Sequence, residues 1–115
     1  MISICRELDV LSAAKTWYIN PGFDCRIIDA YTVTETAITT GNSVITISDG
    51  TTDVGAITIG FTGSAAGDID QITFDSTSLG KVKFTKATAI KIVCGALPDA
   101  GKAELTLVLD EYHGA

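Results

Sequence analysis

Two runs of alternating apolar and polar residues flank a short turn in the middle of the chain. Residues 43–48 (SVITIS) and residues 54–61 (VGAITIGF) each place their isoleucines in phase, and Asp49-Gly50 begins the loop between them. Two such runs joined by a glycine-containing loop of about four or five residues predict an antiparallel β-hairpin. We expect the rest of the chain to supply further strands beside this hairpin.

The longest strand candidate, residues 25–35, precedes the hairpin. Simple alternation places Ile27 and Tyr31 on one face, and Ala30 and Thr32 on the other. Both faces are partly apolar, which is typical of a central strand in a two-layer structure.

Further β-rich runs follow the same period of two. They are residues 16–19, 68–74, 82–85, 89–94 and 102–111. The resulting eight or nine strands, about 8–12 residues apart, predict an all-β antiparallel sandwich or barrel. No linker is apparent, so we expect one domain over residues 16–115.

Residues 1–15 leave three alternatives open. Ile2, Ile4 and Leu8 share one face of a strand pattern, which Arg6 interrupts. Residues 6–14 also fit a helical turn. The segment could instead be an arm that becomes ordered only against a partner.

The composition narrows the possible functions. The chain has 115 residues, of which 46% are hydrophobic, and 14 acidic against 8 basic residues give a net charge of −6. Binding to nucleic acid depends largely on cationic residues that neutralise phosphates, so we expect no nucleic-acid partner. No signal peptide and no run of about 18 apolar residues is visible, so we expect no membrane association and synthesis in a cytoplasm.

Cys5, Cys25 and Cys94 are the three cysteines, and no pair has the spacing of a metal site. We expect free thiols, as in a reducing compartment. The alternative is a disulfide bridge between Cys5 and Cys25.

The sequence offers no catalytic group with supporting partners, and we predict that the protein is not an enzyme. His113 is the only histidine and lies close to the end of the sequence, where residues are commonly mobile. Residues 63–67 are glycine-rich but open no helix and precede no Walker lysine, so no phosphate site is expected. We expect no cofactor.

Aspartates gather in two places. They are Asp49 and Asp53, then Asp68, Asp70 and Asp75. Carboxylates are Ca²⁺ ligands, but Asp also stabilises turns by accepting hydrogen bonds from nearby backbone amides. We favour the turn interpretation.

Several segments together resemble a known family. They are PGFDCRIIDAY (residues 21–31), AITT (37–40), ITI (57–59) and GSAAGDID (63–70). They look like small structural proteins of tailed bacteriophages and resemble the decoration, or cement, proteins of phage heads. The resemblance implies an eight-stranded jelly-roll or similar sandwich. It also implies a homotrimer on the virion exterior that binds the major capsid protein and stabilises the shell.

We predict that the N-terminal segment and nearby aromatic residues make the contacts between subunits. The candidate residues are Ile2, Ile4, Arg6, Leu8, Trp17, Tyr18, Phe23 and Tyr112. Core packing is the alternative for Trp17. A second candidate function is a carbohydrate- or receptor-binding β module of a phage tail, spike or fibre, which would expose an aromatic groove with carboxylates.

Overall fold

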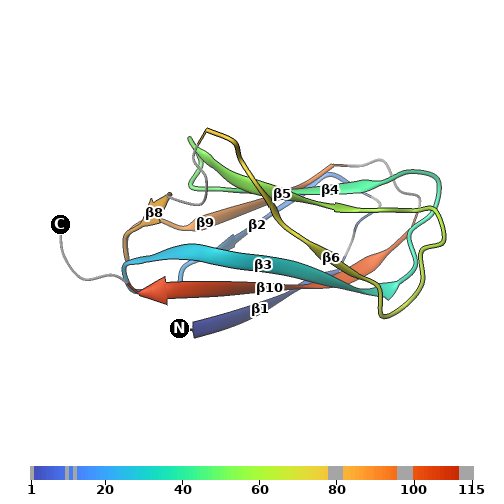
Figure 1. The fold of residues 1–115 in the computed structure, drawn as a ribbon, viewed down its shortest axis with the longest axis horizontal. Helices are drawn as coiled ribbons and strands as arrows, with labels where there is room; N and C mark the ends of the chain where they lie inside the picture. Colours follow the sequence, from blue (N-terminus) through green and yellow to red (C-terminus); the bar gives the residue numbers. More distant parts are fainter. Residues whose placement is uncertain (1, 10, 12, 78–81, 96–99, 112–115) are drawn as a thin grey trace.

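The computed structural model describes residues 2–9, 11, 13–77, 82–95 and 100–111. Within these residues the chain forms ten strands (Figure 1). They are β1 (Ile2–Leu8), β2 (Lys15–Ile19), β3 (Cys25–Thr36), β4 (Ser43–Ser48), β5 (Asp53–Ile59), β6 (Ile69–Gln71), β7 (Thr73–Phe74), β8 (Lys83–Phe84), β9 (Ile90–Cys94) and β10 (Lys102–Glu111). The predicted hairpin is confirmed as β4 and β5, whose strands pair from Ser43–Ile59 to Ser48–Asp53.

The strands form two antiparallel sheets packed face to face, which confirms the predicted all-β sandwich. Sheet A has the order β1-β10-β3-β6, and β8 also pairs with β3. Sheet B has the order β2-β9-β4-β5-β7 and lies above sheet A in Figure 1. Successive strands mostly alternate between the two sheets, so most connections cross from one layer to the other.

The core lies between the sheets and is built mainly from aliphatic side chains at alternate positions. Its members include Ile45 and Ile47 of β4, Ile57 and Ile59 of β5, Ile90 and Ile92 of β9, and Ala103, Leu105, Leu107 and Leu109 of β10. Burying a large aliphatic side chain contributes roughly 1.5–3 kcal/mol. These buried positions are the ones that the alternation of apolar and polar residues predicts for the inward faces of β4, β5, β9 and β10.

Strand β3 is central, as predicted, but its alternation changes phase. Leu109 pairs with Ile27 and Val108 pairs with Asp29, so Ile28 has no partner in β10. This β-bulge inserts one residue and moves the following side chains to the other face. Ile27 and Ala30 are consequently both buried, and the expectation that they lie on opposite faces was wrong.

Residues 69–74 cross from sheet A to sheet B, and we call this side of the sandwich the strapped edge. Its β6 pairs with β3, and its β7 pairs with β5. The crossing is visible in Figure 1 as the diagonal segment that runs past β5. Residues 68–74 form two strands and not the single strand predicted, because alternation alone does not reveal a change of sheet.

Gly55 permits the close approach of β7 to β5. A Cβ atom on Gly55 would overlap the Thr73 carbonyl oxygen and lie 3.0 Å from Phe74 Cα. Because both neighbours are backbone atoms, they cannot move aside cheaply. The crossing of the strapped edge therefore depends on the absence of a side chain at position 55.

Strands β1 and β2 lie on the opposite side, which we call the open edge. Every residue of β1 has a partner in β10, from Ile2 opposite Leu109 to Leu8 opposite Ala103. The strand alternative is thus the observed one for residues 2–8, and the helical turn expected over residues 6–14 is wrong at residues 6–8, which lie in β1. The physical reason is that β1 satisfies the outer edge of β10 and carries Leu8 into the core.

Candidate interaction surfaces

The predicted contact residues separate into exposed and buried groups. Arg6 and Tyr18 are exposed, and Tyr18 has an exposed fraction of 61%. Ile2, Ile4 and Phe23 are half-buried. Tyr112, like His113, lies outside the described residues.

Leu8 and Trp17 require a correction. Leu8 is fully buried and Trp17 is 3% exposed, and both belong to the core cluster. In the short edge strands β1 and β2, alternation did not show which side chains the opposite sheet covers. These two side chains stabilise the fold and are not available for direct contact with a partner.

A hollow of about 330 Å³ lies at the open edge, where β1 approaches β2. It is lined by Cys5, Arg6, Glu7, Asp9 and Lys15. Lys15 Nζ lies 2.9 Å from an Asp9 carboxylate oxygen and 5.4 Å from the centre of the Trp17 ring. The hydrogen bond from Lys15 lowers the pKa of Asp9.

Both strands of the open edge carry a cation at an inward-facing position. Arg6 lies opposite the buried Leu105, and Lys15 lies opposite the buried Cys94. Charges at such positions disfavour uncontrolled pairing of an edge strand with another sheet. Lys15 is paired with Asp9, whereas Arg6 has no ion-pair partner among the described residues.

The strapped edge has the opposite charge at the equivalent position. Asp70 lies opposite the buried Thr32, and it is half-buried. Burial and the neighbouring Asp68 carboxylate both raise the pKa of Asp70. Beside it, Ile69 has an exposed fraction of 64%, the highest among the exposed large hydrophobic residues.

The loop that leads into β6 is held by backbone hydrogen bonds. Gly67 N–H donates to Thr34 O at 2.7 Å, and Thr34 N–H donates to Asp68 O at 2.8 Å. Ala65 N–H donates to the Asp68 carboxylate at 2.9 Å. Ile69 and Asp70 directly follow this loop, so the chain's own hydrogen bonds hold them in position.

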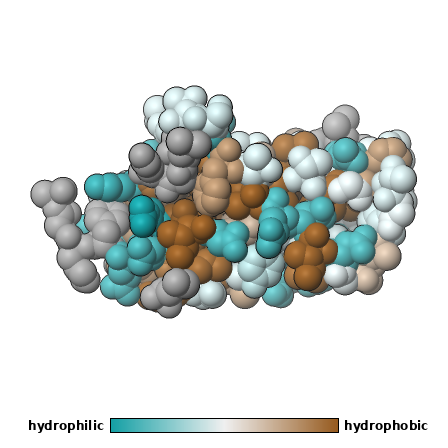
Figure 2. All heavy atoms as spheres, viewed as in Figure 1, coloured by the Kyte–Doolittle hydropathy of each residue, from teal (hydrophilic) through white to brown (hydrophobic). Residues whose placement is uncertain are grey.

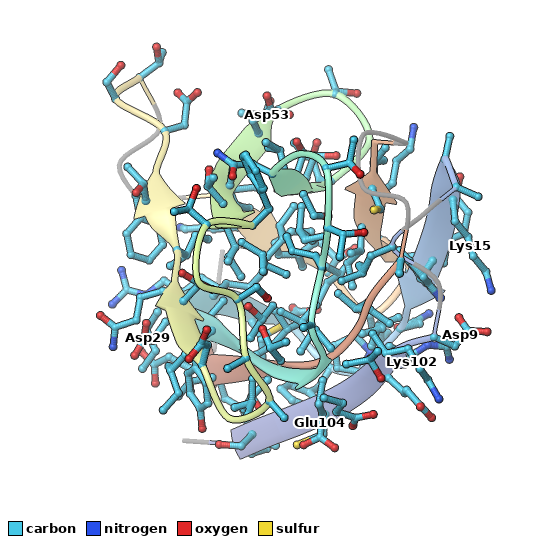
Figure 3. The ribbon with its side chains drawn as sticks, turned by 90° about the vertical axis from the view of Figure 1, so that its right-hand side faces the viewer. Asp9, Lys15, Asp29, Asp53, Lys102 and Glu104 are labelled. Carbon is cyan, nitrogen blue, oxygen red and sulfur yellow. The ribbon has the colours of Figure 1, made fainter. Side chains whose placement is uncertain are left out.

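The outward side of sheet B forms a second surface, which we call the Thr-rich face. Its residues are Thr16, Val44, Thr46, Ala56, Thr58, Thr73 and Val93, together with a row that crosses the strands from Tyr18 through Lys91 and Ser48 to Asp53. Lys91 and Asp53 have opposite charges, so the face carries little net charge. Asp53 lies at its end, near the top of Figure 3.

A shallow hollow of about 420 Å³ lies over β4, β5 and β7 on this face. It is lined by Thr46, Asp53, Gly55, Ala56, Thr58, Thr73, Phe74 and Asp75. Phe74 lies opposite the buried Gly55 and packs partly against the core. The hollow therefore presents hydroxyl and carboxylate groups more than an exposed aromatic ring.

The outward side of sheet A is strongly charged by comparison. It carries Glu7, Asp29, Glu104 and Asp110 together with Arg26 and Lys102.

Viewed from the strapped edge, Figure 2 shows apolar side chains in separate groups among polar ones. The Thr-rich face went unnoticed in the sequence, although the outward threonines of residues 43–61 could have indicated it.

The three thiols are free, as expected, and the Cys5–Cys25 bridge was wrong. Cys5 on β1 and Cys25 on β3 are separated by β10, a gap of about 9–10 Å between strand axes. A disulfide requires Cα atoms within about 7 Å. Burial raises the pKa of both Cys25 and Cys94, which disfavours their reactive thiolate forms.

Asp49, Asp68 and Asp75 accept hydrogen bonds in local turns, whereas Asp53 and Asp70 lie in strands β5 and β6. Asp49 accepts hydrogen bonds from Thr51 N–H and Thr52 N–H at 2.8 and 2.7 Å, which lower its pKa. Asp75 accepts one from Thr77 N–H at 2.9 Å. No group of three or more potential metal-ligating side chains occurs in the part of the chain that the structure describes.

That same part of the chain contains no helix of the length and apolarity needed to cross a bilayer. Comparison with family models, curated proteins and solved structures finds no significant match for this chain.

Proposed function

We propose that this chain is a capsid decoration protein, which binds the outer surface of the major capsid protein as a homotrimer and stabilises the shell. In this proposal it acts on the virion exterior by contact alone. The observation that carries the proposal is the Thr-rich face, because it is a broad, nearly neutral surface on a protein of net charge −6.

Docking a flat sheet face removes water from every side chain on it. Charged groups are costly to desolvate unless they find a partner, and they are depleted at the centres of protein interfaces. Threonine, valine and alanine on β4, β5 and β9 avoid most of this cost. Tyr18 adds an exposed aromatic side chain at the margin of the face.

The strand order supports the jelly-roll arrangement that the family resemblance implies. The last strand, β10, returns to lie between β1 and β3, while β9 lies between β2 and β4. Such returns of late strands beside early ones are typical of Greek-key folds. Two Greek keys in two sheets make a jelly roll, a fold used by viral capsid and lectin domains.

The hollow on the Thr-rich face favours a second candidate, a carbohydrate- or receptor-binding module of a phage tail, spike or fibre. Its threonine hydroxyls, with Asp53 and Asp75, could hydrogen-bond a sugar. Phe74 packs partly against the core, so the stacking ring expected for such a site is weakly developed. Decoration of the capsid therefore remains our first proposal.

The experiment is to incubate the protein with expanded, undecorated phage heads and to measure bound protein per shell after sedimentation. We expect saturable, stoichiometric binding. Thr58→Glu adds an exposed charge to the Thr-rich face and should lower occupancy at least about tenfold. Thr36→Glu, an exposed change on β3 of sheet A and away from both edges, is the matched control and should bind as the unmodified protein does.

Absence of saturable binding to heads would overturn the proposal. Binding to host surface glycans that is lost in the Thr58→Glu variant would favour the second candidate. Loss of head binding in Thr36→Glu, with full binding by Thr58→Glu, would place the contact on sheet A and refute the assigned face.

A further inference from the structure

One row of inward-facing residues crosses the whole of sheet A and ends in opposite charges. The row consists of Arg6 on β1, Leu105 on β10, Thr32 on β3 and Asp70 on β6. Leu105 and Thr32 are fully buried, whereas Arg6 is exposed and Asp70 is half-buried. Sheet A thus has a cation at its open edge and a carboxylate at its strapped edge, and both lie in the same row of paired residues.

The strand directions allow this row to continue into a second copy. Each neighbouring pair in the order β1-β10-β3-β6 is antiparallel, so β1 and β6 run in opposite directions. If the β1 strand of another copy lay beside β6, the sheet would continue as an antiparallel sheet. Extending the row without a shift would place Arg6 of one copy opposite Asp70 of the next.

Neither outer strand of sheet A is fully used within the described part of the chain. No further strand pairs with the outer side of β1 or β6. Backbone groups on such edges can bind another strand. Ile69 on β6 also exposes 64% of its surface, and apolar burial against a neighbour would add to the contact.

The charges on the two edges are complementary between copies and unfavourable within one. Arg6 lacks an ion-pair partner among the described residues, and Asp70 lies beside the like charge of Asp68. Opposite charges directly across antiparallel strands attract, and like charges repel. A second copy would therefore give both groups the partner that the described part of their own chain does not supply.

We infer that copies of this chain associate head to tail, with the open edge of one against the strapped edge of the next and Arg6 facing Asp70 across the contact. Such a heterologous contact can close into a ring, whereas a self-complementary contact about a two-fold axis gives a dimer. The inference rests on the proposed function for the trimer, and it assigns the surfaces that join the subunits.

The competing explanation is that Arg6 and Asp70 only protect the two edges from pairing. Under that explanation the protein is a monomer, and each of the two charges helps to prevent its association. Reversing one charge separates the two explanations, because it removes attraction in the ring but preserves an inward-facing charge on the edge.

The test compares the unmodified protein with Arg6→Asp, Asp70→Arg and the double variant, by light scattering over a range of micromolar concentrations. We expect concentration-dependent trimers of the unmodified protein. Each single reversal should raise the dissociation constant at least about tenfold, and the double variant should recover most of that loss. Lys86→Asp, an exposed change away from the row, is the control for net charge.

Thermal unfolding of each variant establishes that it is folded before association is measured. A monomeric unmodified protein, single variants that still associate, or a double variant no better than the singles would each overturn the inference. Head binding is scored separately with the Thr-rich-face variant. Trimers that fail to bind heads would overturn only the proposed function, and head binding by a monomer would overturn only the trimer contact.

Discussion

The two edges of the sandwich are closed in different ways. At the strapped edge the chain itself crosses between the sheets, and β7 lies directly against Gly55. At the open edge, ion pairs join Lys15 to Asp9 and Lys102 to Glu7, at 2.9 and 3.5 Å. The side chains of these pairs are 41–54% exposed, so solvent screens both pairs and neither contributes much to stability.

The difference shows where each edge derives its stability. Because surface ion pairs contribute little, the open edge must depend on the side chains beneath it, Leu8 and Trp17. The strapped edge depends on backbone contact at Gly55 and on Ile72 and Phe74, which pack only partly against the core, since Ile69 on its surface is mostly exposed. Figure 3 shows the labelled Lys15 and Lys102 on the side of the open edge and Asp29 on the other side.

The largest expected effect is at the open edge. Leu8→Ala removes a fully buried side chain and should lower the free energy of unfolding by about 2–5 kcal/mol. Ile69→Ala at the strapped edge is the control and should change it by less than about 0.5 kcal/mol. Urea unfolding of the two variants measures both values, and equal losses would show that the edges do not differ as described.

The next effect tests the strapped edge. Gly55→Ala places a methyl group against the backbone of Thr73 and Phe74 and should cost about 1–3 kcal/mol through displacement of β7. Gly60→Ala is the matched control, because nothing lies within 4 Å of the position its Cβ would take. Hydrogen exchange should show faster exchange confined to β7 and the edge of β5. Unchanged stability in Gly55→Ala would contradict the contact.

These contrasts also separate what the sequence predicts from what it does not. The hairpin and the apolar face of β10 follow directly from local alternation, because successive side chains of a strand point to opposite faces. Ile28 breaks that rule in β3. Both faces of residues 25–35 are partly apolar, so nothing in their hydrophobicity reports the change of phase.

The candidate surfaces were harder to predict because they depend on register between distant strands. Arg6 was identified as a contact residue, but Asp70 was considered only as a turn or Ca²⁺-binding residue. Their common row appears only when β1, β10, β3 and β6 are placed in register. Likewise, Leu8 and Trp17 could be placed in the core only once the inner face of each edge strand was known.

The middle of the row offers a gain in stability. Thr32 is fully buried, and its hydroxyl has no hydrogen-bond partner within the described chain. Thr32→Val has nearly the same shape and removes the unsatisfied group, so it should raise the free energy of unfolding by about 1 kcal/mol. Thr58→Val, at an exposed position, is the control. A loss of stability in Thr32→Val would indicate that the hydroxyl has a partner.

The smallest effect concerns Asp70 and depends on pH. Burial and the charge of Asp68 raise its pKa above the ordinary value of 3.8, so the folded protein binds this proton more tightly than the unfolded chain. Its contribution to stability is complete below the unfolded pKa and is lost as pH rises through the folded pKa. Near neutral pH the carboxylate therefore destabilises the isolated subunit.

Asp70→Asn should thus be more stable than the unmodified protein at pH 7, by about 0.5 kcal/mol or less, and the difference should vanish near pH 3. Urea unfolding in dilute solution, where the protein is monomeric, measures it at both pH values. Asp49→Asn should behave oppositely, because two backbone N–H groups lower the pKa of Asp49. Its loss of stability should be present at pH 7 and should shrink in acid.

Asp70→Asn should also associate more weakly, because the amide lacks the charge that faces Arg6 of the next copy. A subunit that becomes more stable alone and less able to form trimers would show that Asp70 serves the contact and not the fold. An advantage of Asp70→Asn that persists unchanged at pH 3 would contradict the raised pKa. Unchanged association would leave the carboxylate with only the role of guarding its edge.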